Sequence, residues 1–176
     1  MSMDSHAVLT VVGDDRTGLV DEVTRFVADC GGNLENSRMV NLHGQFAMMM
    51  LIGGSQQTMD CLAARLPGLV EESRVRAELT PAGADRPAAA AIPYRLTTSS
   101  MDHPGLVQPV AHLLSERGIN IESADTTLSQ APITGAPLFE MELVLSVPAD
   151  VAVAELRAAL ARLCDGLNMD WRLATL

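Results

Sequence analysis

The chain contains no lysine, because all 12 of its basic residues are arginine in a sequence of 176 residues. A Schiff-base lysine, the lysine of a phosphate-binding loop and a lysine general base are therefore excluded. Aromatic residues are also scarce, at 3% of the sequence. An RNA-recognition module stacks bases on aromatic side chains of its sheet, so this scarcity argues against that class as well.

Cysteine is equally sparse, and Cys30, Cys61 and Cys164 are scattered without C-x-x-C spacing. An odd, dispersed set is typical of buried free thiols in a reducing compartment, and it favours neither a disulfide nor a metal site. Residues 1–6 lack the basic and apolar segments of a signal peptide. The longest apolar run, residues 46–52, is too short to span a bilayer. We therefore expect a cytoplasmic protein without membrane contact, metal or cofactor.

Acidic residues outnumber basic ones by 22 to 12, which gives a net charge of −10. The charge is evenly spread: residues 1–86 hold 7 Arg and 12 acids, residues 87–176 hold 5 Arg and 10 acids, and each half carries −5. A uniformly acidic chain repels the phosphate backbone, so direct binding to nucleic acid is not expected. The hydrophobic fraction of 48% predicts a folded protein with a sizeable core.

The sequence contains an internal duplication. Residues 9–36 align without a gap on residues 96–123 at an offset of 87, and ten of the 28 aligned positions are identical. Further along, the offset becomes 93, so the second copy carries six additional residues, within 130–137. The identical pairs include both the glycines and the polar residues of the motif described below.

Each copy predicts the same succession of elements. A short apolar strand ends in a turn, and an amphipathic helix follows, with a double glycine as its end in the first copy. A β-hairpin, a second helix and a last strand complete the copy. In the first copy the second helix is predicted over residues 55–66, and the apolar face of the first helix is formed by Leu19, Val20, Val23, Phe26, Val27 and Cys30.

The order βαββαβ predicts an α+β fold of two tandem ferredoxin-like units, each an antiparallel sheet with helices on one face. We expect domains at residues 1–80 and 92–176, joined by a Pro, Ala and Gly-rich linker at 81–91. Unpaired sheet edges favour pairing of the units and a homodimer.

One motif occurs in both copies: Asp-x-x-Gly-Leu-Val followed by Gly-x-Asn-[Leu or Ile]-Glu. It spans Asp15 to Glu35 and Asp102 to Glu122. This pattern resembles the ACT domain, a family of regulatory modules that bind amino acids. The resemblance implies a ligand held by the first loop and the start of the first helix, between paired domains. By that resemblance the ligand-binding positions are Asp15, Arg16, Gly18, Leu19, Asn33, Asp102, His103, Gly105, Leu106 and Asn120.

The same residue types suit an amino-acid ligand on chemical grounds. A carboxylate or amide oxygen accepts from the ammonium group, helix N-terminal amides donate to the carboxylate, and glycine lets a ligand approach the backbone. Structural roles remain open for the same residues. Asp15 and Asp102 are good helix N-caps, and Asn33 and Asn120 are common turn residues.

The whole chain resembles the group of glycine cleavage system transcriptional repressors. That resemblance implies a non-enzymatic sensor of glycine that acts on a LysR-type DNA-binding activator, and a long second hairpin around 130–137. Two alternatives stay open. The chain could regulate an amino-acid biosynthetic enzyme as a subunit. It could also be an enzyme, although Ser99, Ser100 and His103 have no counterpart in the first copy that would form a nucleophile and base pair.

Overall fold

The structure is a computed structural model that describes residues 5–83, 90–131 and 135–176. The chain divides into two compact units, residues 1–86 and 87–176. Among the described residues, no helix is both long enough and apolar enough to cross a membrane. Each unit is described separately below.

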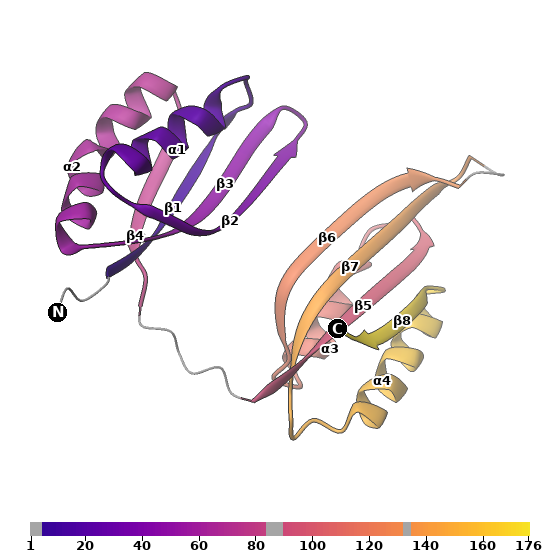
Figure 1. Ribbon diagram of the computed structural model, residues 1–176. Coiled ribbons are helices and arrows are strands. Elements are labelled where there is room, and N and C mark those ends of the chain that lie inside the picture. The colour runs from indigo at the N-terminus through magenta and orange to yellow at the C-terminus, as the bar shows by residue number, and fades with distance from the viewer. Residues whose placement is uncertain (1–4, 84–89, 132–134) are drawn as a thin grey trace. The chain divides into compact units, whose positions relative to one another are not determined.

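The first unit has six elements, β1 (Ser5–Asp14), α1 (Leu19–Asp29), β2 (Asn33–Leu42), β3 (Gln45–Gly54), α2 (Gln56–Ser73) and β4 (Arg76–Pro81). Its four strands form an antiparallel sheet in the order β2-β3-β1-β4. Both helices lie on one face of this sheet (Figure 1). The predicted βαββαβ unit is confirmed.

The second unit repeats this arrangement with β5 (Ala91–Met101), α3 (Val107–Ser115), β6 (Asn120–Gln130), β7 (Pro137–Pro148), α4 (Val153–Gly166) and β8 (Asp170–Thr175). Its antiparallel strand order is β6-β7-β5-β8, which matches the first unit strand for strand. A register shift occurs at the same place in both units, between Leu34 and Asn36 and between Ile121 and Ser123.

Each unit has its own core between the sheet and the helices. Alternate residues of the central strand β1, Ala7, Leu9 and Val11, are buried, and the residues between them face the other side of the sheet. Leu96 on β5 is likewise fully buried in the second core. The predicted helical face is only partly correct. Val20 is 40% exposed, because the residue after the buried Leu19 is turned about 100° away from the core.

The second helix is longer than predicted. Ser55 caps α2 by accepting from the Thr58 amide at 3.2 Å, but the helix continues through Pro67 to Ser73. An interior proline normally costs about 3 kcal/mol. Beyond it, Leu69 and Ser73 are buried against the core, and this packing offsets part of that cost.

The prediction of free thiols is wrong for two of the three cysteines. Cys30, at the end of α1, and Cys61, in α2, form a disulfide, with their Cα atoms 5.6 Å apart. Helix packing brings together two residues that are 31 positions apart in the sequence, which spacing alone cannot reveal. Cys164 is the buried free thiol that was expected, and burial raises its pKa.

Two predicted connecting segments lie only partly in the described residues. Between the units, β4 ends at Pro81 and β5 begins at Ala91, and residues 84–89 lie outside the described part of the chain. In the second copy β6 ends at Gln130 and β7 begins at Pro137, and residues 132–134 between them are also outside the described part of the chain. Within the hairpin, the Gly135 amide donates to the Ala131 carbonyl at 2.9 Å.

Candidate functional site

The loop after β1 is fastened to the β2–β3 hairpin. The Asp15 amide donates to the Gly44 carbonyl at 2.7 Å, and the Asn41 side chain donates to the Asp15 carboxylate. Beside this pair, Gln45 donates to the Asp14 carboxylate at 2.6 Å. Asp15 is therefore not the helix N-cap that the sequence allowed. The first turn of α1 begins at Gly18 without a side-chain cap.

Arg16 joins the same loop to both helices. Its guanidinium donates to both carboxylate oxygens of Glu22 on α1, at 2.7 and 2.6 Å, and to the Ser73 carbonyl at the end of α2 at 3.3 Å. The Ser73 hydroxyl also donates to Glu22 at 2.8 Å. The hydrogen bond from Arg16, followed by that from Ser73, lowers the pKa of Glu22 from 4.5 to about 2. Three of the five N–H donors of the Arg16 guanidinium are thus used within the first unit.

The two motif glycines adopt a conformation that other residues rarely take. Gly18 has φ 91° and Gly105 has φ 93°, so both loops turn into their helices through the left-handed region. The leucines that follow, Leu19 and Leu106, are buried in the two cores. Their side chains hold the helices to the sheets, and only their backbone amides lie at the loop.

The second unit repeats the backbone of this loop without its side-chain network. The Asp102 amide donates to the Pro137 carbonyl at 3.0 Å, as the Asp15 amide does to Gly44. His103, in the place of Arg16, is exposed, and its Nδ1 lies 3.1 Å from the Pro104 carbonyl oxygen. In the described part of this unit, the Asp102 carboxylate has no side-chain partner.

Two buried hydroxyl groups lie on β5 just before this loop. Thr98 is 4% exposed and Ser100 is 6% exposed, and neither hydroxyl has a hydrogen-bond partner among the described residues. Both residues face the helices, because they alternate with Thr97 and Ser99 along the strand. Buried hydroxyl groups are usually hydrogen-bonded, so this end of the second core is unusually polar and incompletely paired.

Asn33 and Asn120 lie at the opposite end of their sheets from the aspartates. Asn33 pairs with Gly53, which pairs with His6, whereas the loop begins at Asp14, eight residues further along β1. At 3.4 Å per residue that separation is about 27 Å. Asn120 donates to Glu122 at 2.7 Å and, ahead of Ser146, lowers the pKa of that carboxyl. Within one unit, no single amino acid can contact both the aspartate and the asparagine.

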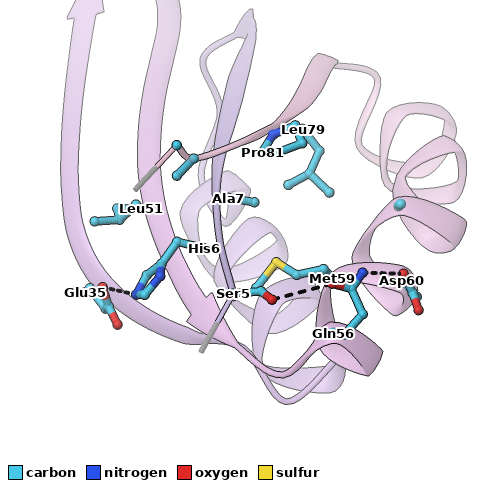
Figure 2. Close-up of a pocket in the computed structure, with 13 residues that line it drawn as sticks. Ser5, His6, Ala7, Glu35, Leu51, Gln56, Met59, Asp60, Leu79 and Pro81 are labelled. Carbon is cyan, nitrogen blue, oxygen red and sulfur yellow. Dashed lines mark hydrogen bonds and ion pairs between the residues drawn. The ribbon is translucent and has the colours of Figure 1, made fainter. Parts of the chain in front are cut away.

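A cleft of about 760 Å³ opens at the asparagine end of the first unit (Figure 2). His6 and Glu35 form an ion pair at 3.3 Å on one side of it. On the other side the Gln56 side chain lies 3.5 Å from the Ser5 hydroxyl and donates to Asp60 at 2.9 Å. This cleft was not predicted from the sequence, since its residues come from the start, the middle and the end of the first copy.

Comparison with known proteins places these features in a family. Residues 5–80 match the model of the ACT domain. The second unit has the same strand order, the same register and the same loop glycine as the first. The first unit is therefore an ACT domain, and the second unit repeats its fold.

Known proteins are similar to this chain over nearly its full length. A glycine cleavage system transcriptional repressor of Escherichia coli (strain K12) is 27% identical over 170 residues, which cover 96% of this chain and 88% of the repressor. An unknown protein from Galdieria sulphuraria has a solved structure with a TM-score of 0.81 and 26% identity, covering 99% of both chains. A structure provisionally described as a glycine cleavage system transcriptional repressor has a TM-score of 0.73 and 25% identity, again over 99% of both.

The two units therefore bring together only part of the predicted site. Asp15, Arg16 and Gly18 share one loop, as do Asp102, His103 and Gly105. Sequence reasoning missed Glu22, Ser73, Asn41 and Gln45, which bind the first loop. Asn41 and Gln45 had a readable signal, because the hairpin turn is predicted at residues 43–45. Gln45 lies in that turn and Asn41 just before it, and in an antiparallel hairpin the returning strand brings the turn to the end of β1. In the described residues, no three side chains are grouped to hold a metal ion.

Proposed function

We propose that this tandem ACT-domain protein is a non-enzymatic regulator that senses an amino acid and acts through another protein. The observation that supports this most is the full-length similarity to glycine cleavage system transcriptional repressors, together with a loop of the same geometry built twice in one chain. On that similarity, glycine is the effector, and regulation of the glycine cleavage system is the output.

The loop of the second ACT domain is the better effector site. Its Asp102 carboxylate is not engaged by a neighbouring side chain of the described residues, whereas Asp15 is bound by Asn41. In this site Asp102 accepts from the ligand ammonium, and the free backbone amides at the start of α3 donate to the ligand carboxylate. Gly105 has no Cβ and open space beside it, so a small ligand such as glycine can approach the backbone there.

In this proposal the partner protein, and not this chain, contacts DNA. The net charge of −10 repels a polyanion, so repression works through a DNA-binding activator, of LysR type in the resemblance above. Binding of the effector shifts the population of conformations and so changes the surface presented to that partner.

Thermal unfolding of the full chain with each common amino acid tests the sensor. At a hundred times Kd, a ligand stabilises the folded state by about 2.7 kcal/mol. We expect glycine to raise the unfolding midpoint, and Asp102→Asn to abolish that rise. Asp15→Asn serves as the matched control and should retain most of it. No shift with any amino acid would contradict the sensor.

A second experiment tests the partner. The purified chain should not shift an operator fragment by itself but should change the mobility or occupancy of a LysR-type activator on it. Direct, salt-resistant binding of the chain to DNA would overturn this part of the proposal. Co-purification with an amino-acid biosynthetic enzyme and not with an activator would favour a regulatory subunit instead.

A further inference from the structure

The sheet of the first ACT domain has an apolar outer face, meaning the face that its helices do not cover (Figure 1). This face consists of the residues that alternate with the core positions on β1, β2 and β3. Met49 at its centre is 53% exposed, and Val40 is 45% exposed. The apolar members are Val8, Val12, Val40, Leu42, Ala47, Met49 and Leu51.

The second ACT domain shows that the fold does not require such a face. Val8 and Val12 are replaced there by Arg95 and Ser99, and Ala47 and Met49 by Glu140 and Glu142, at the same register positions. Arg95 and Glu142 form an ion pair across the strands at 3.2 Å. The two domains therefore share a fold but differ in their outer faces. The outer face of the second domain is polar and suited to water, whereas that of the first domain exposes apolar side chains of the kind that mark an interaction surface.

Charges lie at the two edges of the apolar face, in its middle row. That row runs across the four strands as Arg38, Met49, Thr10 and Glu78. Arg38 and Glu78 are both exposed, and neither has an ionic partner among the described residues. The middle row is thus positive at β2, uncharged at Met49 and Thr10 in the centre, and negative at β4.

We propose that this outer face binds the same face of a second copy of the chain. A two-fold axis parallel to the strands, in the plane between two such sheets, places β2 of one copy over β4 of the other and β3 over β1. Arg38 then faces Glu78 of the other copy, twice by symmetry, while Met49 and Ala47 pack over Thr10 and Val12. An isologous contact needs this kind of self-complementary surface.

The known geometry of stacked sheets is compatible with this arrangement. Packed sheets lie about 10 Å apart and cross at about 30°. The long side chains of Arg38 and Glu78 can span that distance. Four strands about 4.8 Å apart and some seven residues long give about 400 Å² of sheet plane on each copy. That size belongs to weak, reversible interfaces, so the dimer should dissociate on dilution through the micromolar range.

Sedimentation velocity of the full chain over a concentration series tests the proposal. The wild type should change from monomer to dimer with rising concentration. Met49→Glu, which installs the residue type of the second domain, should remain monomeric at every concentration. Met39→Glu is the matched control, because Met39 is 57% exposed but lies on the other side of β2. It should dimerise as the wild type does, with an unchanged far-ultraviolet circular dichroism spectrum.

Charge exchange tests the register. Arg38→Glu and Glu78→Arg should each weaken dimerisation by about tenfold or more, and the double variant should restore it. A wild type that stays monomeric would overturn the proposal, as would equal loss in the Met39 and Met49 variants. Rescue of Arg38→Glu by Asp125→Arg would also overturn it, since that result would place the acidic outer face of the second domain of another copy on this surface.

Discussion

In the first ACT domain the two helices are bonded to each other at both ends, whereas the second domain keeps the same helix layer by packing. The Cys30–Cys61 disulfide joins one end of α1 to α2, and Glu22 and Ser73 join the other. At the matching positions of the second domain stand Arg117 for Cys30, Pro109 for Glu22 and Leu167 for Ser73. Both domains nevertheless have the same strand order and loop glycine.

This difference separates what the fold needs from what one copy adds. The fold forms without the disulfide and without the Glu22 and Ser73 contacts, since the second copy keeps the apolar periodicity and the shared motif but lacks these bonds. The added hydrogen bonds of the first copy lie around the loop that carries Asp15, and the disulfide lies at the other end of α1. These hydrogen bonds hold that loop in one arrangement. In the second copy the Asp102 carboxylate has no side-chain partner among the described residues, and two buried hydroxyls on the strand before the loop are unpaired. We interpret the first domain as the more rigid and the second as the more responsive.

Removing the disulfide should have the largest effect, confined to the first domain. A cross-link that closes a loop with a sequence separation of 31 contributes about 3 to 4 kcal/mol. At about 4 to 8 °C per kcal/mol for a domain of this size, reduction or Cys30→Ser should lower the midpoint of the first domain by ~15 °C or more.

Fluorescence can separate the two domains in this experiment. The single tryptophan is Trp171, in the second domain, so its emission reports that domain alone, whereas far-ultraviolet circular dichroism reports both. Under reducing conditions the dichroism midpoint should fall and the fluorescence midpoint should not. A parallel fall in both would show that the disulfide supports the whole chain, and the contrast between the domains would be lost.

Alanine at the loop glycines should affect both domains alike. Gly18→Ala and Gly105→Ala each force a residue with a Cβ into the left-handed region, at a cost of about 1 to 2 kcal/mol. Gly68→Ala is the control, because Gly68 lies inside α2 with nothing within 4 Å of a Cβ. That change should stabilise the chain by up to about 1 kcal/mol. Unequal losses at Gly18 and Gly105 in urea unfolding would show that the two loops are not equivalent.

Thr98→Val should stabilise the second domain. The Thr98 hydroxyl is buried without a partner, and the first domain has Val11 at this position. Replacing an unpaired hydroxyl with a methyl group should contribute about 1 kcal/mol, measured as a higher urea midpoint of Trp171 fluorescence. Thr97→Val on the outer face, where the side chain is half-buried, should change it little. A loss of stability at Thr98 would mean that its hydroxyl is bonded in solution.

The smallest effect is expected for Glu22, because its ion pair with Arg16 is exposed. Its pKa is lowered by folding from 4.5 to about 2, so its stabilising contribution is present above the higher value and is lost as the pH falls through the lower one. Glu22→Gln should therefore differ from the wild type at neutral pH, with the difference shrinking between pH 4.5 and about 2. The same difference at pH 2 and pH 7 would contradict the Arg16 pair.

The sequence predicted more of the fold than of the site. Periodic apolar residues and the offset of 87 determined both βαββαβ units, because local pattern and burial agree along each element. The site was harder, since Asp15 and Asn33 share a motif yet lie at opposite ends of the sheet. A motif is read from the order of residues along the chain. Which of its residues are neighbours in space depends on how the antiparallel strands pair.

By itself the sequence determined the number of units, their element order and the two glycine turns, since these depend on short-range periodicity and on φ. Tertiary structure alone decided the Cys30–Cys61 bond, the Arg16, Glu22 and Ser73 network and the charged row from Arg38 to Glu78. Each of these joins residues from elements far apart in the chain. Such contacts are set by helix packing and strand register, which exist only once the sheet and its helices have come together.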